Sequence, residues 1–234
     1  MDVGDKMILG VTLARGGSKS IPLKNISPIN GIPLLAYTIM EAQKSEFIDH
    51  YLVNTDSEEI AAVAKQYGAD VQFGRPEYLC DDTASSGDTL KYVVERFEET
   101  SSLQPKIVVE LMATNPLKSV LDIDGCIEKY NSLDADSVVA MGRLYDHHPS
   151  RIKFLDDDGR ICDFYPEVPE SRRQDLSPAA YVRAGSIYVL SRDKLNTGIR
   201  YGGSRSFGYR LPDERFLNID EPRDLLVAET LLSI

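Results

Sequence analysis

The 234-residue sequence has no tryptophan, only three histidines and three cysteines, and fewer basic than acidic residues. Its 26 Lys and Arg against 37 Asp and Glu give a formal net charge of −11, which argues against a nucleic-acid partner because phosphates need a basic surface. No apolar run approaches the ~18 residues needed to cross a bilayer, so we expect no membrane partner. Cys80, Cys126 and Cys162 are odd in number and widely spaced, which favours free thiols in the cytoplasm over disulfides or a zinc site.

A second absence is local, since residues 6–40 contain no Asp or Glu. The apolar run Met7–Leu13 predicts a buried strand, and the segment Leu-Ala-Arg-Gly-Gly-Ser-Lys-Ser-Ile-Pro-Leu-Lys-Asn (13–25) continues from it. The carboxyl ends of strands in open α/β sheets bind ligands, and glycines bring backbone N–H groups close to an anion. A basic island in an acidic protein therefore predicts a polyanionic small ligand, most simply a nucleoside triphosphate. The alternative is an ordinary glycine-rich turn with solvated lysines. Three side chains supply the positive charge: Arg15, Lys19 and Lys24.

The loop has neither the Walker spacing nor the dinucleotide Gly-x-Gly-x-x-Gly pattern. Pro22 prevents a helix from starting directly after the glycines. We therefore expect the loop itself, and not a helix N-terminus, to hold phosphates.

Short apolar runs alternate with amphipathic ones over residues 1–142, which predicts an α/β fold with a mostly parallel sheet and helices on both faces. Several prolines and the turn-like Asp156-Asp-Asp-Gly159 predict an irregular, hairpin-bearing excursion at about 145–183. We expect one domain over residues 1–234 that contains this insertion. The expected strands are 7–13, 51–54, 71–73, 107–112, 137–142, 185–190 and 216–219, and the expected helices are 33–44, 57–68, 86–99, 122–133 and 220–232.

The string Leu13–Asn25 resembles the signature of the CMP-sugar synthetases, in particular the acylneuraminate (nonulosonic acid) cytidylyltransferases. Four further stretches are similar to that family and follow in its order, so the resemblance covers residues 7–232. It implies a Rossmann-like nucleotidyltransferase fold, and a homodimer in which the excursion lends residues to the neighbouring site. It also implies transfer of CMP from CTP to a nonulosonic acid with Mg²⁺ (or Mn²⁺). The four stretches are Gly31–Ile39, Val53–Asp56, Arg75–Ser86 and Phe216–Asp220.

For the nucleotide, the resemblance implies that Arg15 and Lys19 contact the triphosphate and stabilise its charge, with Lys24 as a third cation. Asn25 matches a position near the cytidine, where an amide both donates and accepts hydrogen bonds. Arg75 and Ser86 match positions that hold the base or the ribose. The remaining expected nucleotide-binding residues belong to the loop: Ala14, Gly16, Gly17 and Ser18.

For the metal, the resemblance points to Asp220, which follows an apolar run and precedes a helix. Magnesium usually takes one or two carboxylates together with phosphate oxygens, and this carboxylate is also expected to assist deprotonation of the acceptor. The alternative is a helix-capping aspartate. The family often has two aspartates around one residue here, whereas this chain has Asn218, which brings no charge. Asp224 is a further acid that either contributes or is solvated.

For the acceptor, similar proteins carry Gln-Pro-Thr-Ser-Pro-Leu-Arg where this chain has Met112-Ala-Thr-Asn-Pro-Leu-Lys118. We expect Met112, Thr114 and Asn115 at the sugar, and an acceptor with a more apolar edge than N-acetylneuraminate. Arg173 is expected to pair with the sugar carboxylate, because a guanidinium fork suits that group. Arg183 is one place out of register, and a salt bridge within the dimer is an equal alternative.

Two rival functions stay open. A 3-deoxy-manno-octulosonate cytidylyltransferase shares the loop and the chemistry. A catalytically weakened CTP-binding protein is motivated by Asn218, by Met112, and by Ala184 in place of an expected Asn. His147 and His148 are expected to be structural and near the subunit contact, and Asp81 and Asp82 are expected to cap the next segment and not to bind metal.

Overall fold

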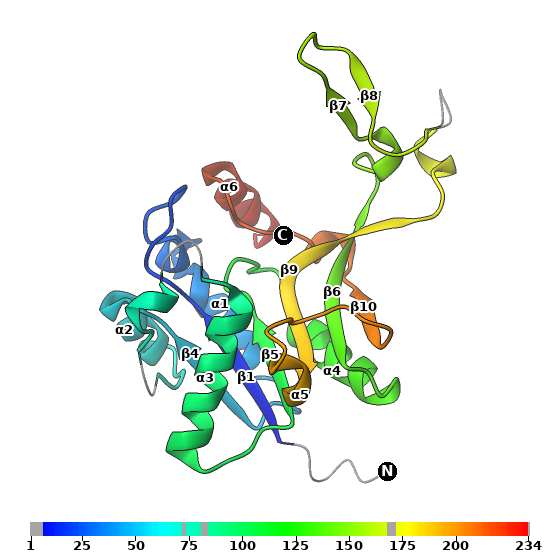
Figure 1. Ribbon diagram of the computed structural model, residues 1–234. Coiled ribbons are helices and arrows are strands. Elements are labelled where there is room, and N and C mark those ends of the chain that lie inside the picture. Colours follow the sequence, from blue (N-terminus) through cyan, green and yellow to red (C-terminus); the bar gives the residue numbers. More distant parts are fainter. Residues whose placement is uncertain (1–6, 72–73, 81–83, 168–171, 234) are drawn as a thin grey trace.

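The computed structural model describes residues 7–71, 74–80, 84–167 and 172–233. Its centre is a six-stranded sheet in the order β10-β6-β9-β5-β1-β4 (Figure 1). β1 pairs in parallel with β4 and β5, and β10 with β6, whereas β9 runs antiparallel between β5 and β6. The expected mostly parallel sheet is confirmed. The strands are β1 (Ile8–Leu13), β4 (His50–Asn54), β5 (Ile107–Leu111), β6 (Ser137–Leu144), β9 (Ala180–Ser191) and β10 (Ser206–Arg210).

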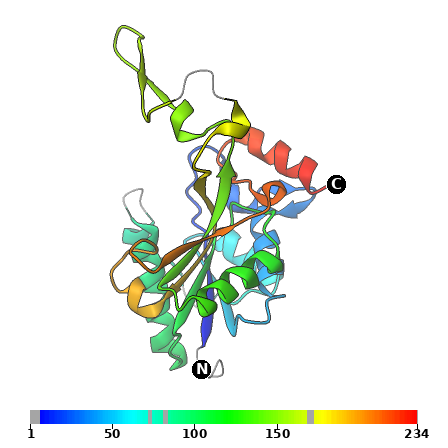
Figure 2. The same ribbon diagram turned by 90° about the vertical axis from the view of Figure 1, so that its right-hand side faces the viewer.

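Helices cover both faces of the sheet (Figure 2). Successive side chains of β5 point to opposite faces of the sheet: Val109 packs with α4 on one face, and Val108 packs with α3 on the other. The carboxyl edge of β1 is flanked by α6 and by the short β2–β3 hairpin, which meet through Ile29, Ile219 and Ala228. On one face lie α1 (Leu34–Ala42), α2 (Glu58–Gln66) and α4 (Val120–Ser132), and on the other α3 (Ser86–Ser101) and α5 (Arg192–Leu195). The remaining elements named here are α6 (Pro222–Leu231), β2 (Pro28–Ile29) and β3 (Ile32–Pro33).

The five long helices begin and end within two residues of the expected positions. Ser57 caps α2 by accepting a hydrogen bond from the N–H of Ile60, and Gly68 ends it with a φ of +82°. After the basic loop only a single turn of 3₁₀-helix forms, η2 (Lys24–Ile26), so the segment after the glycines is not helical, as Pro22 predicts.

Near the C-terminus, one strand prediction is wrong and one strand was not predicted. Residues 216–219 form no strand, because the N–H of Ile219 bonds to the carbonyl of Thr114 in a loop and not to a neighbouring strand. The strand of this region is β10, a five-residue edge strand that was not expected and that packs Phe207 and Tyr209 against the core. The expected strand at 71–73 lies partly outside the described residues, and a single bridge joins Leu52 to Asp70.

The excursion projects from the sheet as an antiparallel hairpin of β7 (Lys153–Leu155) and β8 (Ile161–Asp163) (Figures 1 and 2). Its tip is a turn in which Asp156 Oδ1 accepts hydrogen bonds from the N–H groups of Asp158 and Arg160. His148 is 4% exposed and bonds to Ser150 and to the carbonyl of Pro178, so its role is structural. The three single-turn helices η4 (Pro149–Arg151), η5 (Arg173–Asp175) and η6 (Asp213–Arg215) lie in or beside this region, and η3 (Glu77–Leu79) precedes α3.

The three cysteines are free, as expected. Among the residues that the structure describes, every helix is too short or too polar to traverse a bilayer.

Candidate active site

A cavity of about 470 Å³ opens at the carboxyl edge of the sheet, between the ends of β1 and β5 and the start of α3. The basic loop forms one wall, and residues from the region of α3 and from β5 form the opposite wall. Four cationic side chains and one carboxylate are among its described lining residues, so the cavity favours an anion. Ten of the expected site residues line it: Arg15, Gly17, Ser18, Lys19, Lys24, Asn25, Arg75, Ser86, Met112 and Thr114.

The basic loop is held in place by its own polar groups. Asn25 is 8% exposed and donates from Nδ2 to the carbonyl of Arg15 at 2.9 Å, which ties the two ends of the loop together. The N–H of Gly16 donates to Asp56 Oδ1 at 2.6 Å. Gly16 does not line the cavity, and Ala14 is buried with its N–H bonded to Asn54. The loop therefore lines the cavity with Arg15 and with residues from Gly17 onwards, but not with Ala14 or Gly16.

Arg75 is positioned before any ligand arrives. Its backbone N–H donates to Thr55, and its Nε donates to Asn54 Oδ1 at 3.2 Å. Burial lowers the pKa of Arg75, although Asp56 opposes the effect. Its Nη2 is buried and has no hydrogen-bond partner in the described part of the chain, so a donor is available beside the cavity for a ligand acceptor.

Asp220 lies next to the cavity because the backbone of the preceding residue, Ile219, bonds to two residues that line it. The N–H of Ile219 bonds to the carbonyl of Thr114 at 2.9 Å, and its carbonyl accepts from Lys24 Nζ at 2.8 Å. Lys24 Nζ also lies 3.2 Å from Asp220 Oδ1, while Asn218 Nδ2 donates to Asp220 Oδ2 at 2.6 Å. Asn218 and Asp220 therefore stand side by side, although neither lines the cavity itself.

Asn218 and Asp220 bring together the kinds of oxygen atom that magnesium takes as ligands. Asn218 Oδ1 is buried and accepts no hydrogen bond from the described residues, and the side chain of Asp220 is 66% exposed. One carboxylate and one amide oxygen suit an ion that takes its other ligands from phosphate and water. Within the described ranges, no group of three or more His, Cys, Asp or Glu could hold a metal by itself. Asp224 does not add a ligand here, because its carboxylate caps α6 by accepting from the N–H groups of Asp220 and Glu221.

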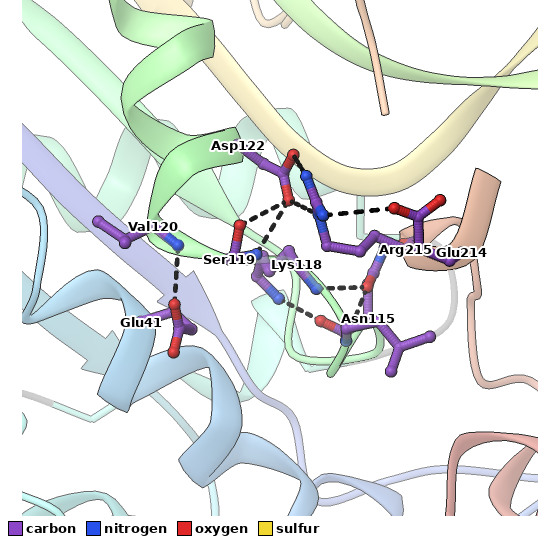
Figure 3. A network of polar contacts seen from close by, with 9 residues as sticks. Glu41, Asn115, Lys118, Ser119, Val120, Asp122, Glu214 and Arg215 are labelled. Atoms are coloured by element: carbon purple, nitrogen blue, oxygen red, sulfur yellow. Dashed lines mark hydrogen bonds and ion pairs between the residues drawn. The ribbon is translucent and has the colours of Figure 1, made fainter. Parts of the chain in front are cut away.

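The side chain of Lys118 holds the segment 112–118 in place, and Figure 3 shows Lys118 next to Asn115 within a network of polar contacts. This side chain is 2% exposed, and its Nζ donates to Thr38 Oγ1, to the carbonyl of Met112 and to the carbonyl of Asn115 at 2.5–2.7 Å. Burial lowers the pKa of Lys118 to about 7, although the carboxylates of Glu41 and Asp122 oppose the shift. Asn115 is fully buried, and its Oδ1 accepts from the backbone of Leu117 and Lys118. It shapes the loop and does not face the cavity.

The two arginines expected at the sugar carboxylate lie elsewhere. Arg173 lines a second cavity of about 260 Å³ at the base of the excursion, where its guanidinium stacks on Tyr145 at 4.5 Å. Arg183 stacks on Tyr201 at 4.5 Å and lines neither cavity. Asp81 and Asp82 lie outside the described residues.

Sequence reasoning missed Glu110, which lines the first cavity from the middle of β5. The available signal was a lone acid within the apolar run Ile107–Met112. Five other lining residues were also missed: Leu13, Ser20, Leu79, Ala84 and Thr89.

Comparison with known proteins decides the family. The sequence model for cytidylyltransferases matches residues 9–211. The chain belongs to the cytidylyltransferase family. It is therefore a nucleotidyltransferase, and the resemblance seen in the sequence is confirmed.

Several curated relatives are similar over most of this chain. Post-translational flagellin modification protein B of Campylobacter coli is 30% identical, over 96% of this chain and 94% of its own length. The pseudaminic acid cytidylyltransferase of Campylobacter jejuni (strain 81-176) is 32% identical, over 94% of each chain. The N-acylneuraminate cytidylyltransferase of Streptococcus agalactiae (serotype V) is 32% identical over 91% of this chain, which spans only 50% of that relative's length.

Solved structures agree on the fold. A CMP:2-keto-3-deoxy-manno-octonic acid synthetase in complex with CTP superposes with a TM-score of 0.70 at 17% identity, covering 97% of this chain and 99% of the other. A cytidylyltransferase from Leptospira borgpetersenii gives a TM-score of 0.60 at 17% identity, covering 97% and 87%. At this level of identity, the likeness supports the nucleotidyltransferase fold alone.

Proposed function

We propose that this protein transfers CMP from CTP to the anomeric hydroxyl of a nonulosonic acid of the sialic, legionaminic or pseudaminic type. The cation-lined cavity at the carboxyl edge carries the proposal, because it combines triphosphate-sized space with Arg15, Lys19 and Lys24. The names of the relatives that act on N-acylneuraminate and pseudaminic acid supply the acceptor class.

In the proposed reaction, the acceptor oxygen bonds to the α-phosphorus, the bond from that phosphorus to the bridging oxygen breaks, and pyrophosphate leaves. Arg15 and Lys19 stabilise the charge on the phosphates, and Lys24 adds a third cation. Asn25, Arg75 and Ser86 hold the cytidine, with the buried Nη2 of Arg75 as a donor to the ribose or the base. The proton of the acceptor hydroxyl passes to the carboxylate of Asp220.

Asp220 and the amide oxygen of Asn218 would hold Mg²⁺ or Mn²⁺ next to the phosphates. When bound, the ion neutralises phosphate charge and polarises the phosphoryl oxygens. In the structure, Lys24 and Asn218 occupy both oxygens of the Asp220 carboxylate, so ligand binding must redistribute these contacts.

We further propose a single-domain homodimer, located in the cytoplasm, in which the excursion covers the neighbouring subunit. The hairpin and its base expose apolar side chains that a partner would bury. Arg173 lies on a different cavity from the expected CTP site, which fits a residue that serves the partner's acceptor. The exposed side chains are Phe154, Leu155, Ile161, Phe164 and Tyr165.

The test is pyrophosphate release from CTP and Mg²⁺ with a panel of four acids: N-acetylneuraminate, legionaminate, pseudaminate and 3-deoxy-manno-octulosonate. Turnover of one of the first three acids supports the proposal and identifies the substrate. Turnover of the octulosonate alone supports that rival instead. No release with any acid, while CTP still binds in calorimetry, supports a catalytically weakened CTP-binding protein.

Met112 refines the expected outcome. It lines the cavity where similar proteins carry a glutamine, and a thioether cannot replace the hydrogen bonds of an amide. We therefore expect legionaminate or pseudaminate to be preferred over N-acetylneuraminate. Comparable kcat/KM on N-acetylneuraminate would contradict this preference.

A further inference from the structure

Glu110 is a fully buried carboxylate in the central strand of the sheet, and it lines the cavity. One oxygen, Oε2, accepts a hydrogen bond from Arg200 Nη1. The other, Oε1, is buried and has no hydrogen-bond partner within the described ranges. Burial raises the pKa of Glu110, although Arg200 and Arg75 oppose the effect.

An open acceptor atom on a buried carboxylate is costly unless something donates to it. Arg200 donates a hydrogen bond to only one oxygen of Glu110, so the second oxygen can accept a hydrogen bond from a ligand. Because the other charged residues that line the cavity are cations, Glu110 is the described lining group that repels the anionic parts of a ligand. It therefore selects a neutral or cationic group that carries an N–H or O–H.

The position of Glu110 assigns it to the acceptor end of the cavity. Side chains two residues apart in a strand share a face, so Glu110 and Met112 point the same way, and both line the cavity. Across the antiparallel pairing, Glu110 lies opposite Tyr188. Arg200 stacks on Tyr188 at 4.4 Å, and the ring of Tyr188 lies 6.2 Å from that of Tyr201, on which Arg183 stacks. Glu110 thus adjoins Met112, which is expected at the sugar, and this row of stacked side chains leads from it to Arg183.

We propose that Glu110 is a specificity-determining residue, whose Oε1 accepts a hydrogen bond from one N–H or O–H substituent of the acceptor. This inference rests on the proposed function. The acceptor then makes two contacts: an apolar carbon contacts Met112, and a hydrogen-bond donor contacts Glu110.

A second source of the same chemistry is the exocyclic amino group of cytosine, since carboxylates accept hydrogen bonds from it. Arg75, with its open Nη2, lies near enough to Glu110 for their charges to interact. We assign the donor to the acceptor, and measurements with CTP and UTP alongside the acids separate the two sources.

The experiment uses analogues of the best acceptor, each with one donor group replaced by hydrogen. In the wild type, one analogue should lose at least about tenfold in kcat/KM relative to the parent. In the double variant Glu110→Leu/Arg200→Leu, the same analogue and the parent should differ by less than about twofold, because the contact no longer exists. This variant removes both charges, so that neither is left buried alone. Glu110→Gln, which keeps the size of the side chain, should reduce the discrimination in the same direction.

Two controls accompany it. Asp122 is another fully buried carboxylate, bonded to Arg215 at 2.7 and 3.0 Å, and it does not line the cavity. Asp122→Asn should leave the ratio between parent and analogue as in the wild type. The affinity for CTP, measured by calorimetry, should stay within about twofold in the Glu110 variants if the base does not contact Glu110.

The Glu110 assignment is wrong if every analogue shows the same loss of kcat/KM relative to the parent acid in the Glu110 variants as in the wild type. It is also wrong if these variants lose the preference for CTP over UTP instead. Failure of the wild type to use any nonulosonic acid overturns the proposed function, and this inference with it. Turnover of a parent acid with equal analogue ratios in wild type and variants overturns the Glu110 assignment alone.

Discussion

Lys118 should make the free energy of unfolding rise with pH between pH 7 and 9. Its Nζ is buried among three oxygens, those of Thr38, Met112 and Asn115. Burial lowers the pKa of Lys118 to about 7 in the folded protein, whereas an unfolded lysine titrates at about 10.4. Between these two values the unfolded state binds more protons, so stability increases with pH.

The size of the effect follows from the two pKa values. Linkage gives an increase of about 2 kcal/mol in the free energy of unfolding from pH 7 to pH 9. For a domain of this length, that corresponds to a rise in Tm of roughly 4–8 °C. The destabilisation is complete below pH 7, where both states are protonated, and it disappears above the pKa of the unfolded lysine.

Urea unfolding of the wild type and of Lys118→Met at pH 7, 8 and 9 isolates this group, because every other titration is common to the two proteins. The wild-type free energy minus that of the variant should grow by about 2 kcal/mol over the range. Lys65→Met, at an exposed lysine of α2, is the matched control and should show no such trend. A constant difference for Lys118→Met would refute the reasoning, and would mean that the three oxygens keep the ammonium charged.

Three further predictions concern the site and the packing around it. Arg15→Ala should abolish product formation and leave the Tm unchanged. If Arg173 serves the partner's site, Arg173→Ala is also inactive, and mixing the two variants should restore about a quarter of wild-type activity after subunit exchange. No recovery on mixing would contradict the shared site. Asn218→Asp should bind Mn²⁺ roughly tenfold tighter in an EPR titration and have a lower Tm without metal, because two carboxylates then adjoin at Asp220; unchanged affinity contradicts the metal assignment. Gly87→Ala should cost roughly 1–3 kcal/mol of stability in urea unfolding, because its Cβ would lie 2.2 Å from the carbonyl oxygen of Gly198. Gly17→Ala, whose Cβ meets nothing within 4 Å, is the control for stability.

The basic loop shows how far local sequence reaches. Its strand, its proline and its cationic residues are contiguous, so their arrangement at the end of β1 follows from chain connectivity. Ten of the expected residues line one cavity, although they come from the loop, from the region of α3 and from the end of β5. The resemblance to a family supplied the distant members of this set, which periodicity could not.

The segment 216–219 shows where pattern fails. Its apolar residues have the composition of a strand, but their backbone is held by Thr114 and Lys24 and by no strand neighbour. Burial alone therefore explains the hydrophobicity, since Ile219 packs with Ile29 and Ala228. Conversely, β10 pairs with β6 and was not expected, although Phe207 and Tyr209 alternate along it and pack against the core, because the run is only five residues long and has a glycine at its centre.

The sequence by itself determined the α/β architecture, the helix boundaries and the place of the basic loop at the end of β1, because these depend on periodicity, caps and charge along short stretches of chain. Only the tertiary structure decided that Arg173 and Arg183 lie outside the cavity and that Asn115 is buried and does not line it. It also decided that Glu110 lines the cavity with one oxygen that has no hydrogen-bond partner among the described residues. These facts depend on contacts between residues up to about a hundred positions apart, such as Asn115 with Arg215 and Glu110 with Arg200, and no local pattern encodes such contacts.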